Sequence, residues 1–226
     1  VGRGDAVAVY METRAEFVLA FLALAKLGAE ASLINNGLSG EGLIHCIKST
    51  SNKKVIVGEE RVSALSAILG DLTLNRSSDY FWLQDSGDVS APDWAIDLSA
   101  EYPSKPETGT IKAKEVAAYI FTSGTTGLPK AAIMNHRKIL AAGHGLGRLG
   151  LQLTPEDRLY LCLPLYHITG LGPGFCGVIS NGASFFLRRS FSASKFWPEV
   201  QKFQTNCFIY VGELCRYLAL QPECPE

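Results

Sequence analysis

The stretch TSGTTGLPK, residues 122–130, gathers small residues and hydroxyl groups beside a single positive charge. Gly124 and Gly127 permit backbone conformations in which exposed N–H groups can surround an anion. Lys130 adds a compact, mobile ammonium that suits a phosphate oxygen. Hydroxyl donors come from Thr122, Ser123, Thr125 and Thr126. This composition predicts a phosphate-binding loop, and an ordinary turn, which favours the same residue types, is the alternative.

The residues that flank this stretch favour a binding loop over a turn. Residues 116–121, VAAYIF, are apolar throughout except for one tyrosine, and they predict a buried strand that runs into the loop. Residues 131–134, AAIM, predict a second strand that leaves it. Open α/β sheets bind their ligands beyond the carboxyl ends of the strands, which is where the loop would lie.

A standard NTPase phosphate loop is excluded by the residues on either side of the lysine. Lys130 follows Gly124 by six positions, as that motif requires. However, Pro129 has no N–H to give to a phosphate, and Ala131 has no hydroxyl for Mg²⁺. The loop also joins two predicted strands, whereas the NTPase loop opens a helix.

His167 is the second candidate for chemistry. It follows a predicted strand over residues 158–165, and it would share an edge of the sheet with the loop if the strands were parallel. Histidines at strand ends often belong to sites, although core packing is the alternative. The remaining histidines are expected to be structural; they are His45, His136 and His144.

Strand and helix patterns alternate along the chain and would position these residues. Strands are predicted at residues 6–10, 30–34, 54–57, 183–187 and 206–211, and helices at 40–49, 136–149 and 193–203. A further helix begins near Thr13, whose T-x-x-E spacing to Glu16 predicts a capping box, and ends at Gly28. This alternation predicts an α/β fold built from βαβ units, with helices on both faces of a mainly parallel sheet.

Composition limits the classes of function. The chain has 226 residues and a formal net charge of −1, which argues against a nucleic-acid-binding surface. Its longest apolar run, residues 17–25, is nine residues, about half of the roughly 18 needed to cross a bilayer, so a buried helix is predicted there. Any peripheral membrane association would use segments outside this chain. The sequence leaves the oligomeric state open.

The six cysteines form no C-x-x-C pair, and they predict reduced thiols rather than a disulfide framework. The first residues do not resemble a secretory signal. A location in the cytoplasm, or at the cytosolic face of a membrane, is therefore expected. Residues 85–112 are polar and rich in proline, and they predict a surface connection that marks a boundary within the domain.

Residues 119–130, YIFTSGTTGLPK, resemble the signature of the acyl- and aryl-adenylate-forming superfamily, which includes the acyl-CoA synthetases. Residues 163–167, LPLYH, are similar to a second core motif of that superfamily. Residues 191–200 and 209–218 resemble the branch of fatty acid transport proteins and very-long-chain acyl-CoA synthetases. The resemblance implies that residues 1–226 are part of the large N-terminal domain of an AMP-dependent synthetase, without its small C-terminal domain.

The resemblance also implies an ATP-dependent fatty acyl-CoA ligase. A fatty acid would react with ATP to give an acyl-adenylate, and CoA would then displace AMP, with Mg²⁺ as the metal ion. Later motifs of the superfamily would lie beyond residue 226, so these residues alone are expected to be inactive. Two alternatives stay open: a fatty acid transporter with a non-essential ligase motif, and another adenylate-forming ligase such as an aryl-CoA or carrier-protein ligase.

The resemblance assigns roles to individual residues. The loop would hold the β- and γ-phosphates of ATP, Tyr119 would anchor the strand below it, and His167 would lie by the reacting carboxylate and gate an acyl tunnel. The loop residues carried over are Thr122, Ser123, Gly124, Thr125, Thr126, Gly127, Leu128, Pro129 and Lys130, with Thr125 also a ligand of Mg²⁺. Residues 170–175, which are small or aromatic, would either line the tunnel or pack in the core.

Overall fold

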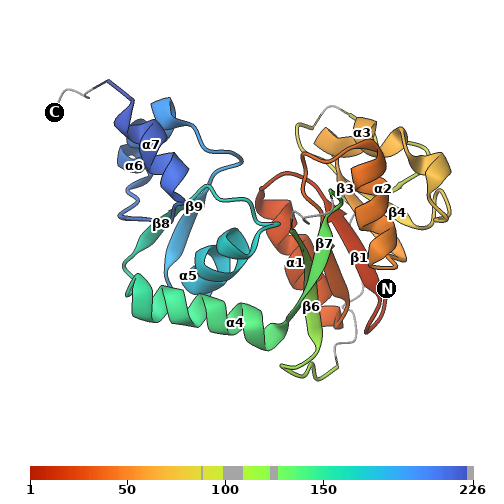
Figure 1. The fold of residues 1–226 in the computed structure, drawn as a ribbon, viewed down its shortest axis with the longest axis horizontal. Helices are drawn as coiled ribbons and strands as arrows, with labels where there is room; N and C mark the ends of the chain where they lie inside the picture. Colours follow the sequence, from red (N-terminus) through yellow and green to blue (C-terminus); the bar gives the residue numbers. More distant parts are fainter. Residues whose placement is uncertain (88, 99–108, 123–126, 223–226) are drawn as a thin grey trace. The chain divides into compact units, whose positions relative to one another are not determined.

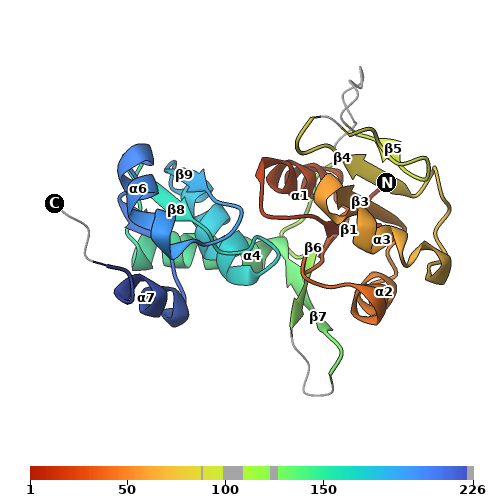
Figure 2. The same ribbon diagram turned by 90° about the horizontal axis from the view of Figure 1, so that it is seen from above.

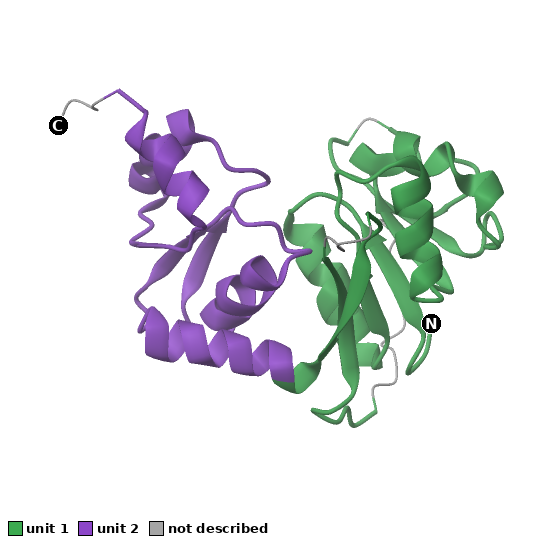
Figure 3. Ribbon diagram, in the orientation of Figure 1, with its two compact units in different colours: residues 1–137 green, residues 138–226 purple. Residues whose placement is uncertain are grey.

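The computed structural model describes residues 1–87, 89–98, 109–122 and 127–222 (Figure 1), and Figure 2 shows it from above. The chain divides into two compact units, Val1–Arg137 and Lys138–Glu226 (Figure 3). The division falls near the start of the helix α4. Residues 96–97, which lie within the predicted surface connection 85–112, form a short strand of the sheet of the first unit.

One sheet organises the first unit. Its seven described strands lie in the order β5-β4-β3-β1-β2-β6-β7. They are β1 Ala6–Tyr10, β2 Glu30–Leu33, β3 Lys54–Gly58, β4 Tyr80–Leu83, β5 Ile96–Asp97, β6 Val116–Thr122 and β7 Lys130–Asn135. Every neighbouring pair is parallel except β6 and β7, which form an antiparallel hairpin. The mainly parallel α/β fold predicted from the sequence is confirmed.

Helices cover both faces of this sheet. The helix α1, Ala15–Leu27, lies on one face, and α2, Gly40–Ser49, and α3, Val62–Ser66, lie on the other (Figure 1). Short 3₁₀ turns, Glu59–Arg61 and Leu69–Asp71, flank α3. Because successive side chains of a strand point to opposite faces, Ala8 and Tyr10 pack with the buried side chains of α2, whereas Val7 lies beneath α1.

The ends of α1 test two sequence predictions. Gly28 ends the helix as predicted, with a left-handed φ of 70° and its N–H directed to the carbonyls of Leu24 and Ala25. The residue before the helix is Arg14, which makes no side-chain capping hydrogen bond, so the helix begins one residue later than a capping box at Thr13 would place it; the capping box itself stays a prediction. The helix is also less buried than predicted, since Leu19 and Leu22 are exposed.

The second unit has a three-stranded parallel sheet of described residues in the order β10-β8-β9. Its strands are β8 Arg158–Leu161, β9 Ser184–Leu187 and β10 Cys207–Phe208. The helices are α4 His136–His144, which continues as a π-helix over Gly145–Gly150, a second π-helix at Gly170–Cys176, α5 Gly177–Ser180, α6 Ala193–Phe203 and α7 Gly212–Ala219.

Two predicted strands of this unit are too long. The strand predicted over 158–165 ends at Leu161, where the backbone begins to turn, and Pro164 further on could not donate to a ladder. The strand predicted over 206–211 is reduced to Cys207–Phe208. By contrast, α6 has the predicted bounds.

Glycines bring the helical segments of this unit into backbone contact. A Cβ atom on Gly143 would lie 2.8 Å from the carbonyl carbon of Cys176, and one on Gly147 would lie 2.9 Å from the Cα of Gly177. A Cβ atom on Gly170 would lie 2.3 Å from the carbonyl oxygen of Pro164. No side chain fits at these three positions without a shift of backbone.

The described cysteines are free thiols, as predicted. Burial raises the pKa of the Cys46 and Cys176 thiols to about 11 and that of Cys162 to about 12. Within the described ranges, the model has no helix with both the length and the apolar character needed to cross a bilayer.

Candidate functional site

The predicted phosphate loop connects the two strands of the β6–β7 hairpin. Thr122 ends β6 and faces Lys130, which begins β7, so this pair closes the ladder on both sides of the loop. The Thr122 hydroxyl lies 3.5 Å from the carbonyl oxygen of Lys130. Since β6 is parallel to β2, the loop lies at the carboxyl edge of the sheet, where the sequence placed it.

Four of the predicted loop residues lie outside the described residues: Ser123, Gly124, Thr125 and Thr126. The second leg of the loop is described from Gly127 onward. Gly127 has a φ of 98°, a conformation that L side chains rarely adopt, and a Cβ atom there would meet no atom of the described residues within 4 Å. The backbone conformation is therefore sufficient to select glycine at this position.

Lys130 is exposed, and its ammonium forms no ion pair with any residue that the structure describes. Leu128 beside it is also exposed. A lysine at a binding loop needs this arrangement, because a charge already neutralised by a carboxylate is a weaker partner for a phosphate. The position of Lys130 is thus compatible with the predicted role.

Tyr119 fixes β6 to the neighbouring strand. Its hydroxyl donates a hydrogen bond of 2.6 Å to the carboxylate of Glu30 on β2. Burial, together with this carboxylate, raises the pKa of Tyr119 to about 12, so the phenol keeps its proton at neutral pH. The contact supports the predicted role of Tyr119 as an anchor of the strand and gives that role a physical partner.

A contact that the sequence did not predict reaches the second leg of the loop. The His45 Nε2 atom on α2 lies 2.9 Å from the carbonyl oxygen of Pro129. His45 was expected to be structural, and no local pattern could have linked it to a proline 84 residues later.

At this edge, Arg14 forms ion pairs with three carboxylates. Arg14, which follows β1, is buried with 6% of its side chain exposed. It lies 2.9 Å from Glu16, 3.7 Å from Glu60 and 4.0 Å from Asp85, and it donates to the carbonyls of Leu83 and Gln84. Arg14 therefore stabilises the fold through these contacts, and its guanidinium group is not free to bind a ligand.

His167 belongs to a different sheet from the loop, so the predicted shared edge is wrong. It follows β8, whose partners are β9 and β10, and a turn of several residues separates it from the end of the strand. Its ring lies 4.7 Å from that of Tyr166, and the residue is exposed to solvent, so only partial desolvation lowers its pKa and favours the neutral imidazole. The sequence could not tell that the strands divide between two sheets.

The small and aromatic residues after His167 are buried. They include Gly170, Gly172, Gly174 and Phe175, and the ring of Phe175 packs edge-on against Phe185 at 5.9 Å. The contact between Gly170 and Pro164 also requires the absence of a side chain. These contacts account for the residues by packing, and the acyl tunnel stays a prediction.

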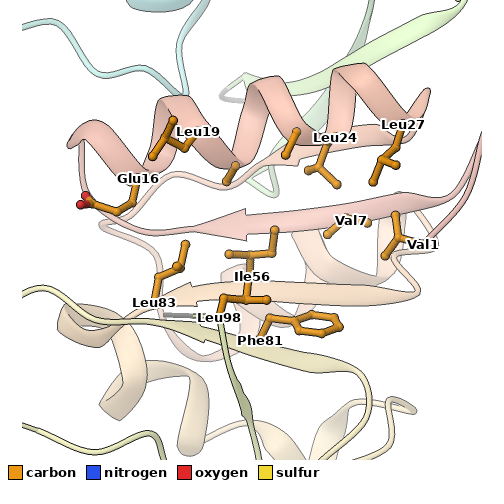
Figure 4. Close-up of a pocket in the computed structure, with 12 residues that line it drawn as sticks. Val1, Val7, Glu16, Leu19, Leu24, Leu27, Ile56, Phe81, Leu83 and Leu98 are labelled. Atoms are coloured by element: carbon orange, nitrogen blue, oxygen red, sulfur yellow. The ribbon is translucent and has the colours of Figure 1, made fainter. Parts of the chain in front are cut away.

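An apolar groove of about 440 Å³ lies between α1 and the sheet (Figure 4). Leu19 and Leu24 line it from the helix, and Val7, Ile56 and Phe81 line it from the strands. Among the described residues around it, Glu16 is the one with an ionisable side chain. The groove lies on the face of the sheet opposite α2, the helix whose His45 contacts the loop.

Comparison with known proteins decides the family. The model of the AMP-binding enzyme family matches residues 1–226. The chain belongs to the AMP-binding enzyme family. Among curated relatives, it is 40% identical over 225 residues to the medium/long-chain-fatty-acid–CoA ligase FadD6 of Mycobacterium tuberculosis, covering 100% of this chain and 36% of the relative.

A second relative of this AMP-binding chain is the mouse long-chain fatty acid transport protein 6, with 37% identity over 224 residues that cover 98% of the chain and 36% of the relative. The chain thus spans about a third of the length of each relative. Its fold is similar to that of ATP-bound MatB from Rhodopseudomonas palustris, with a TM-score of 0.77, 22% identity, and coverage of 98% of this chain and 42% of that one.

Proposed function

We propose that the full-length protein is an ATP-dependent fatty acyl-CoA ligase and that residues 1–226 supply part of its nucleotide site. The observation that carries this proposal is the position of Lys130 in a member of the AMP-binding enzyme family. Lys130 is exposed at the carboxyl edge of the sheet and forms no ion pair with the described residues. The names of the two relatives, a fatty-acid–CoA ligase and a fatty acid transport protein, support a fatty acid as the acid substrate.

The proposed reaction has two displacements. A carboxylate oxygen of the fatty acid attacks the α-phosphorus of ATP, the bond to pyrophosphate breaks, and an acyl-adenylate forms. The thiol of CoA then attacks the acyl carbon, loses its proton, and AMP leaves. In the first step negative charge grows on the leaving pyrophosphate, so the loop and Lys130 would act by positioning and electrostatic stabilisation.

Within the loop, the backbone N–H groups and the hydroxyls from Thr122 to Thr126 would hold the β- and γ-phosphates, with Lys130 on a phosphate oxygen. Mg²⁺ would be bound through Thr125, which lies outside the described residues. The ranges that are described contain no group of three histidine, cysteine or acidic side chains that could hold a metal ion. The metal therefore stays a prediction, and no step is assigned to it.

His167 would contact the reacting carboxylate. Its lowered pKa favours the neutral imidazole near pH 7, so one ring N–H could donate a hydrogen bond to the carboxylate. A neutral ring would not form an ion pair with the carboxylate, so the reaction would have no ion pair to break. The free thiols fit a cytosolic location, where reducing conditions prevail. Residues 1–226 alone are proposed to be inactive.

The test is ATP–pyrophosphate exchange by the full-length protein with fatty acids of graded chain length. Exchange that depends on a fatty acid, followed by thioester formation on addition of CoA, is the expected result. Absence of exchange with every fatty acid would refute the ligase. Exchange with aryl acids in place of fatty acids, or transfer to a carrier protein in place of CoA, would assign a different adenylate-forming ligase.

A second candidate function, fatty acid transport with a dispensable ligase, is favoured by the name of the mouse relative. The two functions differ in their dependence on Lys130. Uptake of fatty acid by cells that survives Lys130→Ala, while ligase activity is lost, would favour the transporter. Loss of both together would show that uptake depends on activation of the acid.

A further inference from the structure

His45 connects a well-anchored helix to the second leg of the phosphate loop. Its Nε2 atom lies 2.9 Å from the carbonyl oxygen of Pro129. A carbonyl oxygen can only accept a hydrogen bond, so Nε2 must carry the hydrogen and donate. The side chain is half-buried, which protects the bond from full competition with water.

The helix that carries His45 is firmly held. Leu43, Cys46 and Ile47, which flank His45 in the sequence, are buried in the core beneath α2. Just after the helix, the Thr50 hydroxyl makes a buried hydrogen bond of 2.8 Å to the Ser32 hydroxyl on β2. His45 therefore projects from a base that cannot move without disturbing the core of the sheet.

The second leg of the loop is stiff where His45 meets it. Proline fixes its own φ and restricts the residue before it, here Leu128, to extended conformations. Pro129 lies one residue outside Thr122 and Lys130, the last pair of described residues in the hairpin ladder. Within the described ranges, His45 supplies the side-chain hydrogen bond to its carbonyl.

A restraint on the Pro129 carbonyl is passed directly to Lys130. The peptide group is planar, and the plane that contains the Pro129 oxygen also contains the Cα atom of Lys130. Holding the oxygen therefore fixes the point from which the lysine side chain starts. An exposed, flexible ammonium gains from this, since less of its freedom is lost when it meets a phosphate.

We propose that His45 is a positioning residue for Lys130, acting through the carbonyl of Pro129 to set the second leg of the loop for binding ATP polyphosphate. The proposal rests on the proposed function, because it assigns a role within the same nucleotide site. It makes His45 a residue that tunes nucleotide binding without touching the nucleotide.

The first test compares three variants of the full-length protein. His45→Met removes the donor while preserving bulk and helix propensity, and His45→Gln places an amide N–H at a similar reach. Lys48→Met is the matched control, because Lys48 is exposed on the same helix. Initial rates are measured as ATP and fatty acid are varied separately, and thermal unfolding is followed in parallel.

We expect His45→Met to lower kcat/KM for ATP by about two- to tenfold, the range that one hydrogen bond of ordinary strength supplies. KM for the fatty acid should not change. His45→Gln should restore most of the loss, and Lys48→Met should behave as the wild type. Equal losses for ATP and fatty acid, or no rescue by glutamine, would show a purely structural role and overturn the proposal.

A double-mutant cycle with Lys130→Ala tests the route of the effect. If His45 acts through Lys130, His45→Met should weaken ATP binding by less than about twofold when the lysine is already absent. An undiminished effect in that background would overturn the proposal. Hydrogen exchange of the Lys130 amide gives a readout that needs no activity, and it should be faster in His45→Met, with an unchanged rate refuting the contact.

The outcomes separate this proposal from the function on which it rests. A wild-type protein that catalyses no exchange with any fatty acid refutes the ligase, and the role of His45 is refuted with it. An active wild type whose rates are unaltered by His45→Met keeps the ligase and refutes the role of His45 alone.

Discussion

Replacing Lys130 by alanine should separate the activity of the protein from its stability. The lysine side chain is exposed and forms no ion pair with the described residues, so its removal should change the free energy of unfolding by no more than about 0.5 kcal/mol. An ammonium about 4 Å from a phosphate charge contributes about 4 kcal/mol near a protein surface. That corresponds to a loss of about a thousandfold in kcat/KM for ATP.

The assay is ATP–pyrophosphate exchange by the full-length protein, with the free energy of unfolding measured by urea denaturation of the same samples. Lys114→Ala is the matched control, since Lys114 is also exposed and precedes β6 at the opposite end of the hairpin. Its activity should equal that of the wild type. Lys130→Arg keeps the charge but changes its shape, and it should have intermediate activity.

Two results would refute the reasoning. Exchange activity of Lys130→Ala within about threefold of the wild type would mean that the ammonium does not meet the polyphosphate. A loss of more than about 2 kcal/mol in the free energy of unfolding would mean that the lysine has a structural partner, because substitutions at exposed sites rarely cost so much.

Three further predictions concern the scaffold. Arg14→Met should lower the free energy of unfolding by about 1–3 kcal/mol in urea titrations, because the partly buried Glu60 loses its cation and the carbonyls of Leu83 and Gln84 lose their charged donor; a loss below about 0.5 kcal/mol would contradict this. Gly143→Ala should lower the free energy of unfolding by about 1–3 kcal/mol in thermal unfolding, since the new Cβ atom meets the backbone of Cys176. Gly145→Ala should leave the stability unchanged or raise it, because a Cβ atom there meets open space. Equal effects of the two substitutions would refute the packing argument. The raised pKa of Tyr119 stabilises the folded state while the phenol is protonated, by about 1 kcal/mol after solvent screening. This contribution should be present below pH 10 and lost as pH rises to about 12. Tyr119→Phe should remove this part of the pH dependence, and a difference in unfolding free energy between variant and wild type that stays constant from about pH 10 to about 12 would contradict the prediction.

The elements that the sequence predicts well are those fixed by local patterns. Strand β1 and helices α2 and α6 have the predicted bounds, because apolar periodicity and nearby turn residues determine them. The start of α1 is less predictable, because Arg14, the residue before the helix, makes ion pairs with Glu16 and Glu60 that depend on the folded edge of the sheet. Local spacing carries no information about such partners.

The same distinction between local patterns and tertiary contacts applies to the residues of the candidate site. Lys130 and Tyr119 lie on the two strands that flank the loop, because a hairpin continuous in sequence can be read from local patterns, and their roles stay predictions. His45 was missed because its partner, Pro129, comes from a distant segment. His167 was assigned to the wrong sheet, because a parallel strand pattern does not state which strands are neighbours. Contacts between distant segments are set by the tertiary fold and have no local signature.

The place of the hairpin in the strand order has a consequence for solubility. Among the described strands, β7 stands at the end of its sheet, and an edge strand offers unpaired backbone groups to which another molecule could add. Pro129 withholds an N–H and Lys130 places a charge where that edge begins. The residues proposed to bind ATP would thus also limit strand-to-strand aggregation, so light scattering should accompany every measurement on variants of either residue.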